Sequence, residues 1–161
     1  SRTMAASAGI TVAEADKIVA RLRAIHPGVV AWHKRVDAQL RKNRTITNAF
    51  GYRIIYFKRP GECLTNALAW IGQGTVACAI NRAMVNINEE IVKNPDLGTE
   101  FLMQQHDSLV GQTLTQHWDR VRPMLREQFL KVAIPYPEPL VIPPDLKVST
   151  THWGVMEKCS W

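Results

Sequence analysis

His106 and Asp107 are the residues best suited to chemistry, and they interrupt the segment FLMQQHDSLVGQ at residues 101–112. Apolar-rich runs on both sides predict two strands, which places the pair at the tip of a β-hairpin. An aspartate there could ligate a hard cation such as Mg²⁺, and the histidine could hydrogen-bond a phosphate or a sugar. The alternative is an ordinary turn, because aspartate often bonds nearby backbone amides with its own side chain.

Gln73 is a second candidate, because it stands between Gly72 and Gly74 in an otherwise apolar helical pattern. Each glycine inside a helix costs about 1 kcal/mol relative to alanine. The bare surface around the amide therefore needs a reason. One reason is the close approach of a bulky ligand to Gln73; the other is a close contact between two helices.

Positive charge is concentrated in one segment. Residues 34–59 hold eight basic residues and one acid, whereas the whole chain has a net charge of +6, so the remainder is almost neutral. A localised basic stretch predicts a polyanionic partner. A solvated helix face followed by a loop has the same composition and remains the alternative.

The elements that must position these residues follow from hydrophobic spacing and turn residues. Thr11 and Glu14 predict a capping box at the start of the first helix. The other expected elements are a helix from about 29 to 42, strands within 45–57, a long helix ending before Pro95, the hairpin at 101–110, a helix at about 113–132, a Pro-rich link at 135–144 and a strand at 146–149. This order predicts an α+β fold.

Composition bounds the class of protein. The length of 161 residues suits one domain, and without a run of about 18 apolar residues or an apolar leader we expect no membrane partner and no secretion. The three cysteines have no CxxC spacing, which favours a reducing compartment over a disulfide framework or a zinc site.

Five segments together carry a resemblance to a known family. ITVAEADKIVARLRAIHPGVVAWHKRV (10–36) is similar to a helix, turn and helix of that family, and TNAFGYRIIYF (47–57) to its T-x-x-GRR hairpin. ALAWIGQGTVACAINRAM (67–84) is similar to its QGTAADIIKRAM helix, MQQHDSLVGQ (103–112) to QVHDELVFE, and LKVSTTHWGVM (146–156) to its closing strand. In this order the segments resemble the C-terminal part of a family-A DNA polymerase, the bacterial DNA polymerase I type.

The resemblance implies a partial polymerase palm, whose antiparallel sheet carries the His-Asp hairpin, with long helices. Residues 1–161 would be one incomplete unit, with fingers-side helices to about 60 and the C-terminal palm beyond. Asp107 would ligate catalytic Mg²⁺ ions in a two-metal site, and His106 would lie near the primer 3′ end. Gln73 would reach the minor groove, where an amide can test duplex shape without reading sequence. The remaining DNA contacts would come from Lys42, Arg44, Arg53 and Asn66.

Three positions depart from the family pattern. Ser108 stands where the family has an acid, and Thr65 and Ala69 stand where it has Arg and Asn. Asn66 lies about one helical turn before Ala69 and could replace a lost contact.

The family's upstream strand with its first metal-binding aspartate and its helix with Lys and Tyr have no counterpart among these residues. One aspartate cannot hold two metal ions. We therefore expect this chain to need a complementary polypeptide that carries both segments, together with primer-template and dNTP, before it can polymerise DNA. Ser1 in place of an initiator Met suggests a processed or trans-spliced split polymerase; a fragment of a longer enzyme is the other explanation.

Two further functions remain open. The chain could be a basic DNA-binding remnant whose catalysis has lapsed, which Ser108 and Thr65 favour, or an RNA-copying family-A enzyme. Each of these functions implies an intracellular location, in the cytoplasm of a bacterium or of a phage-infected host cell.

Overall fold

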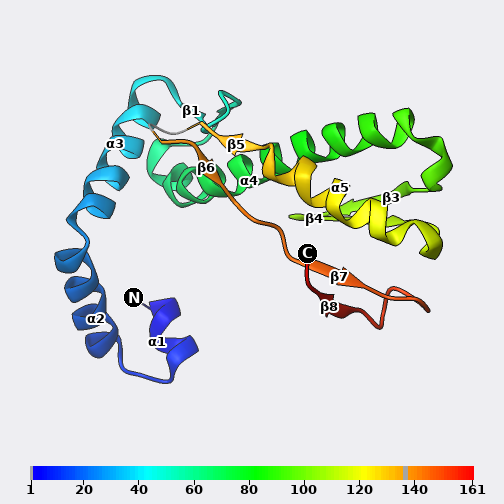
Figure 1. Ribbon diagram of the computed structural model, residues 1–161. Coiled ribbons are helices and arrows are strands. Elements are labelled where there is room, and N and C mark those ends of the chain that lie inside the picture. Colours follow the sequence, from blue (N-terminus) through cyan, green and yellow to red (C-terminus); the bar gives the residue numbers. More distant parts are fainter. Residues whose placement is uncertain (1, 136–137) are drawn as a thin grey trace. The chain divides into compact units, whose positions relative to one another are not determined.

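The computed structural model describes residues 2–135 and 138–161 and has the α+β fold that the sequence predicts. Ser1 and Pro137, which the sequence interpretation used, lie outside the described residues. The elements are α1 (Arg2–Ala8), α2 (Val12–Ile25), α3 (Pro27–Asn43), β1 (Thr45–Thr47), β2 (Arg53–Ile55), α4 (Pro60–Lys93), β3 (Glu100–Gln105), β4 (Ser108–Gln112), α5 (Trp118–Leu130), β5 (Ala133–Ile134), β6 (Leu140–Val141), β7 (Leu146–Val148) and β8 (Glu157–Cys159) (Figure 1). Two short 3₁₀ turns, η1 (Pro95–Leu97) and η2 (Thr115–His117), follow α4 and precede α5.

The described strands pair only with their neighbours along the chain, in four two-stranded sheets. The pairs β3–β4, β5–β6 and β7–β8 are antiparallel. The chain divides into two compact units, one of residues 1–46 and 53–69 and the other of residues 47–52 and 70–161.

The first unit contains α1, α2 and α3. Thr11 caps α2 in the predicted way: Glu14 donates its backbone N–H to the threonine hydroxyl at 3.2 Å, and the Glu14 carboxylate accepts from the backbone N–H of Thr11 at 2.9 Å. Apolar residues that this unit buries include Ala15, Val36 and Leu40. The expected apolar stripe of α2 is only partly covered, because Leu22 is 57% exposed and Ile25 is 60% exposed.

The second unit is built on the C-terminal part of α4 and on α5. Ala83 and Ile87 lie one helical turn apart on α4 and are both buried, as are Val121 and Gln128 on α5. Asn86 of α4 donates a long 3.5 Å hydrogen bond to the backbone carbonyl of Gln128.

α4 begins at Pro60, which occupies the first helical turn where a missing N–H costs nothing, and ends before Pro95 as predicted. Its length and composition would also let it cross a membrane, a criterion that core helices of globular proteins meet as well. The sequence expectation of no spanning segment did not anticipate a helix of this kind.

Candidate functional site

His106 and Asp107 form the two-residue turn between β3 and β4, as the sequence predicts. Gln105 pairs with Ser108 at the end of the ladder, and both turn residues are exposed. His106 has a positive φ of 51°, which tight hairpin turns require at their first residue and which few non-glycine residues adopt. The Ser108 hydroxyl donates to the carbonyl of Gln105 at 2.8 Å, a hydrogen bond that links the two residues flanking the turn.

A β-bulge at Leu102 determines which side chains of the hairpin face α4. Phe101 pairs with Gly111, but Met103 pairs with Val110, so one extra residue is inserted in β3. Because directly opposed residues share a face, the bulge places Phe101 on the same side as Gln104 and Leu109. Both apolar members of this set are half-buried, whereas Leu102 is 55% exposed.

Gly111 permits the close strand approach at the bulge. A Cβ at this position would lie 2.8 Å from the backbone carbonyl oxygen of Glu100. Backbone cannot give way as a flexible side chain can, so the site requires glycine.

A hydrogen bond joins the hairpin to α4. Gln104 donates from Nε2 to Oδ1 of Asn81 at 2.9 Å. Asn81 lies eight residues after Gln73 on the same helix, about 12 Å along its axis. The strand that ends in the His-Asp turn is thereby attached to the helix that carries the candidate amide.

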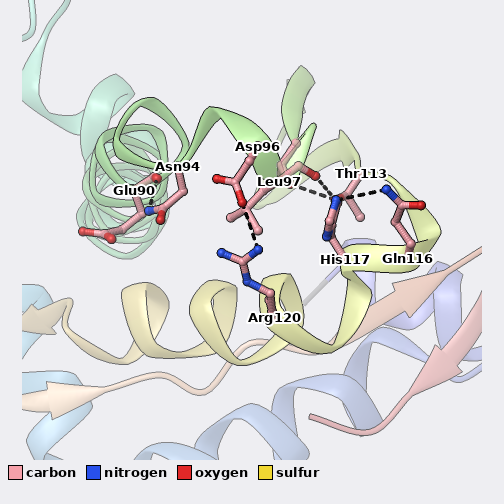
Figure 2. A network of polar contacts seen from close by, with 9 residues as sticks. Glu90, Asn94, Asp96, Leu97, Thr113, Gln116, His117 and Arg120 are labelled. Carbon is pink, nitrogen blue, oxygen red and sulfur yellow. Dashed lines mark hydrogen bonds and ion pairs between the residues drawn. The ribbon is translucent and has the colours of Figure 1, made fainter.

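The base of the hairpin is held by a second set of polar contacts, shown in Figure 2. The Thr99 and Thr113 hydroxyls are 2.8 Å apart, and Thr113 also donates to the carbonyl of Leu97. Arg120 of α5 donates to the Asp96 carboxylate at 2.9 Å. This hydrogen bond lowers the pKa of Asp96 below its ordinary value of 3.8, so the pair is charged at neutral pH.

The two glycines beside Gln73 have different surroundings. Gln73 is exposed, and a Cβ at Gly72 would meet nothing within 4 Å. A Cβ at Gly74 would instead approach the Trp70 ring at 3.0–3.3 Å. Among the described residues of this unit, no helix packs at Gly72, so the helix–helix contact considered from the sequence is not found there. Gly74 instead leaves room for the indole of Trp70.

Residues 47–52, the loop between β1 and β2, pack on the same turn of α4. Asn48 is buried and donates from Nδ2 to the carbonyl of Gly74 at 2.9 Å. The backbone N–H of Ala49 donates to the Thr75 hydroxyl at 3.3 Å. Beside this contact lies a hollow of about 390 Å³, whose lining includes Asn48, Tyr52, Trp70, Gly74, Asn81 and Arg82.

The other predicted DNA contacts lie in the first unit. Lys42, Arg53 and Asn66 are exposed there. Arg44 ends α3 in the left-handed conformation, and its guanidinium donates to the carbonyls of Phe57 and Lys58 at 3.1 and 3.2 Å. Arg44 therefore has a structural task at the end of α3 in addition to any contact with a ligand.

Asp107 has the chemistry of a ligand for a hard cation. In the described part of the chain its carboxylate makes no ion pair or side-chain hydrogen bond, so both oxygens are available. Residues 2–135 and 138–161 contain no group of three or more His, Cys, Asp or Glu side chains placed to hold a metal. The chemistry of the carboxylate therefore suits one ligand position of a metal site, and the described residues place no further ligand group beside it.

Sequence reasoning did not identify Asn48 and Asn81. Asn48 follows Thr47 before a turn, where asparagine is ordinary, and Asn81 lies on a helix face among residues of mixed polarity. Their partners are 26 and 23 residues away. Of the two, only Asn48 offered a sequence signal, because it stands in the TNAFG turn that the family resemblance includes.

Three comparisons with known proteins bear on this site. A family model described as DNA polymerase family A matches residues 1–152. Among solved structures, the POL domain of Pol1 from M. smegmatis in complex with DNA primer-template and dNTP has a TM-score of 0.73 and 24% sequence identity. The match covers 85% of this chain and 25% of that one, so this chain spans about a quarter of that protein's length and shares its fold. No curated protein sequence matches the chain.

Proposed function

Because the chain belongs to DNA polymerase family A, we propose that it supplies the C-terminal palm of a template-directed DNA polymerase. The reaction is attack of a primer 3′-hydroxyl on the α-phosphate of a dNTP, with pyrophosphate as the leaving group. The observation that carries the proposal is the His106-Asp107 turn, held by Gln104 to the helix of Gln73. The β3–β4 hairpin thereby presents a metal ligand, and α4 presents an amide that can contact the duplex.

Asp107 is the residue of this chain that holds Mg²⁺. Its exposed carboxylate offers the hard oxygen ligands that Mg²⁺ prefers. Bound there, the ions would neutralise charge that develops on the transferring phosphate. Further carboxylates must come from another part of the enzyme, because a two-metal site needs several converging acids.

His106 lies beside this ligand and contacts the primer end. Its positive φ holds the imidazole in the turn instead of along the strand. An imidazole N–H can donate to the sugar or phosphate of the terminal nucleotide. His106 therefore orients the primer, while Asp107 serves the metal.

Gln73 and the basic segment bind the duplex. The exposed amide of Gln73 can donate to the N3 and O2 acceptors of the minor groove, and the open space at Gly72 lets the groove approach. Lys42, Arg53 and Asn66 contact phosphates or template through exposed side chains. These contacts are independent of sequence, as copying requires.

Reconstitution tests the proposed activity. The chain is mixed with a polypeptide that carries the upstream palm strand and fingers helix of a family-A polymerase, with Mg²⁺, primed template and dNTPs. We expect primer extension that Asp107→Asn abolishes, while Asp119→Asn, an exposed acid on α5, leaves it unchanged. Extension that persists with Asp107→Asn would contradict the metal-ligand role. Addition of ribonucleotides in place of dNTPs distinguishes an RNA-copying enzyme.

A DNA-binding remnant without catalysis is the second candidate, favoured by Ser108 in place of the family's acid. Here the hydroxyl of Ser108 is already engaged with the carbonyl of Gln105. A remnant would bind primed template in a salt-dependent manner but would extend no primer with any complementary polypeptide. Both functions place the protein where DNA and nucleotides are found, inside the cell.

A further inference from the structure

Asn48 is a buried polar side chain that none of the proposed roles uses, and every polar atom of it is bonded. Its Oδ1 accepts the backbone N–H groups of Phe50 and Tyr52, each at 3.0 Å. Its Nδ2 donates to the carbonyl of Gly74 at 2.9 Å and to Sγ of Cys78 at 3.2 Å. The side chain is 6% exposed.

The two ends of this amide do different things. The oxygen bonds only within loop 47–52 and so shapes the turn, as asparagine does in many turns. The nitrogen bonds only to α4 and so docks the finished turn on the helix. A substitution that keeps the oxygen and removes the donor would separate docking from shaping.

A second contact docks the loop at the next residue of the helix. The Thr75 hydroxyl accepts the backbone N–H of Ala49 at 3.3 Å and donates to the carbonyl of Ile71 at 2.6 Å. Farther along α4, the Arg82 guanidinium lies 4.4 Å from the centre of the Phe50 ring, within the range of a cation–π contact. The loop therefore meets α4 at three points.

The hydrogen bonds at Gly74 and Thr75 lie in the part of α4 whose backbone is least restrained by its own residues. The turn of Gln73 contains Gly72 and Gly74, and glycine inside a helix leaves the backbone more freedom than other residues do. A carbonyl oxygen has two lone pairs, so Gly74 can accept from Asn48 as well as from its own helix. The bonds to Gly74 and to Thr75 fix the two residues that directly follow Gln73.

We propose that Asn48 is a positioning residue that fixes the helical turn of Gln73 by docking loop 47–52 onto it. Gln73 can then test the shape of the minor groove from a fixed position, which a loose glycine-flanked turn would not provide. The inference rests on the proposed function, because the duplex is the ligand of Gln73.

Asn48→Asp is the decisive variant, since it keeps the acceptor for Phe50 and Tyr52 but loses the donor to Gly74. The measurement is the dissociation constant of the 161-residue chain for a primer-template duplex, by fluorescence anisotropy at one fixed salt concentration. We expect Asn48→Asp to weaken binding by at least about fivefold, because it removes one hydrogen bond and also turns a buried carboxylate oxygen toward the carbonyl of Gly74. In a Gln73→Ala background we expect the same change to have less than about a twofold effect, because contacts that act through one group are not additive.

Thr75 supplies a matched pair of variants. Thr75→Ser keeps the hydroxyl that accepts from Ala49 and should bind the duplex as the wild type does. Thr75→Val removes the hydroxyl at nearly the same shape and should weaken binding in the same Gln73-dependent way as Asn48→Asp.

The outcomes separate the inference from the function on which it rests. Losses from Asn48→Asp and Gln73→Ala that simply add, with normal binding by the wild type, would overturn the positioning role alone. The same holds if Thr75→Val binds the duplex as tightly as Thr75→Ser. A wild-type chain that does not bind the duplex would overturn the proposed function and this inference with it.

Discussion

Gln104 of β3 donates a 2.9 Å hydrogen bond to Asn81 of α4, and this contact holds the His-Asp hairpin against the helix that carries Gln73. A two-stranded hairpin is at best marginally stable alone. The described strands β3 and β4 pair only with each other, so contacts outside the ladder must add stability, and the bond to α4 is one of them. The position of Asp107 then depends on residues that touch neither metal nor DNA.

Asn81→Ala should loosen the hairpin. Gln104 loses its acceptor, and because both side chains are exposed, water replaces part of the bond. The cost is about 0.5–1.5 kcal/mol, so backbone amides of residues 100–112 should exchange with deuterium several-fold faster, measured by mass spectrometry. Gln105→Ala, one residue farther along β3 and without a side-chain hydrogen bond in the described structure, is the control and should exchange as the wild type does. Equal protection in both variants would show that this bond does not hold the hairpin.

Gly111→Ala and Gly72→Ala should change stability in opposite directions. The added methyl at Gly111 meets the Glu100 carbonyl oxygen at 2.8 Å, and forced overpacking typically costs about 1–3 kcal/mol. At Gly72 the methyl meets open space on a helix, where alanine is favoured by about 1 kcal/mol. Urea unfolding followed by circular dichroism gives both free energies of unfolding. A stable Gly111→Ala protein would mean that the bulge rearranges at little cost.

The fold should tolerate asparagine at position 106 but should be destabilised by valine there. Asparagine adopts a positive φ readily, whereas the φ of 51° is strained for a β-branched residue. We expect His106→Val to lower the free energy of unfolding by about 1–2 kcal/mol and His106→Asn to leave it nearly unchanged. In the reconstituted enzyme both should slow primer extension, since neither carries an imidazole. Fast extension by His106→Asn would exclude a role specific to imidazole.

Asp96 should make stability depend on pH in acid. Its folded-state pKa is lowered below 3.8 by the hydrogen bond from Arg120, so its contribution is present above the unfolded pKa and disappears as the pH falls through the folded value. The wild type should therefore melt at a higher temperature than Asp96→Asn at pH 7, and the difference should disappear as the pH falls through the folded-state pKa of Asp96.

Asp119→Asn is the matched control, because it removes a neighbouring exposed acid of α5 that forms no ion pair in the described residues. Its melting temperature should follow that of the wild type at each pH. A gap between wild type and Asp96→Asn that stays constant in acid would exclude the ion pair as its source.

Local patterns predicted the elements well where one physical cause dominates. The Thr11–Glu14 capping box, the end of α4 before Pro95 and the hairpin tip at His106-Asp107 all depend on neighbours within a few residues. Hydrophobic spacing did not predict where α4 starts, because Pro60 begins the helix ahead of its apolar stripe. The two-residue strands β5 and β6, whose pairing spans the Pro-rich link, were not anticipated.

Contacts between distant residues were beyond the reach of these patterns. The hydrogen bonds of Asn48 to Gly74 and of Gln104 to Asn81 depend on how the elements pack, and residue spacing along the sequence does not predict that packing. The bulge at Leu102 was also missed, because EFLMQQ alternates too weakly to reveal an inserted residue. The family resemblance pointed to the correct family through its motifs, yet it implied no role for Asn48, Asn81 or Gln104.

The extra residue at Leu102 makes the hairpin tolerant of loss but not of gain. A deletion of one residue between Phe101 and Met103 would convert the bulge into a regular ladder, with every remaining side chain on its present side. An insertion of one residue at the same point would also keep Phe101 on its present side in a regular ladder, because an odd spacing from Met103 puts the two on opposite faces. It would, however, move Phe101 two places along the partner strand, away from Gly111. The strand can therefore lose one residue without a change of partner for Phe101, whereas one added residue moves Phe101 past its present partner.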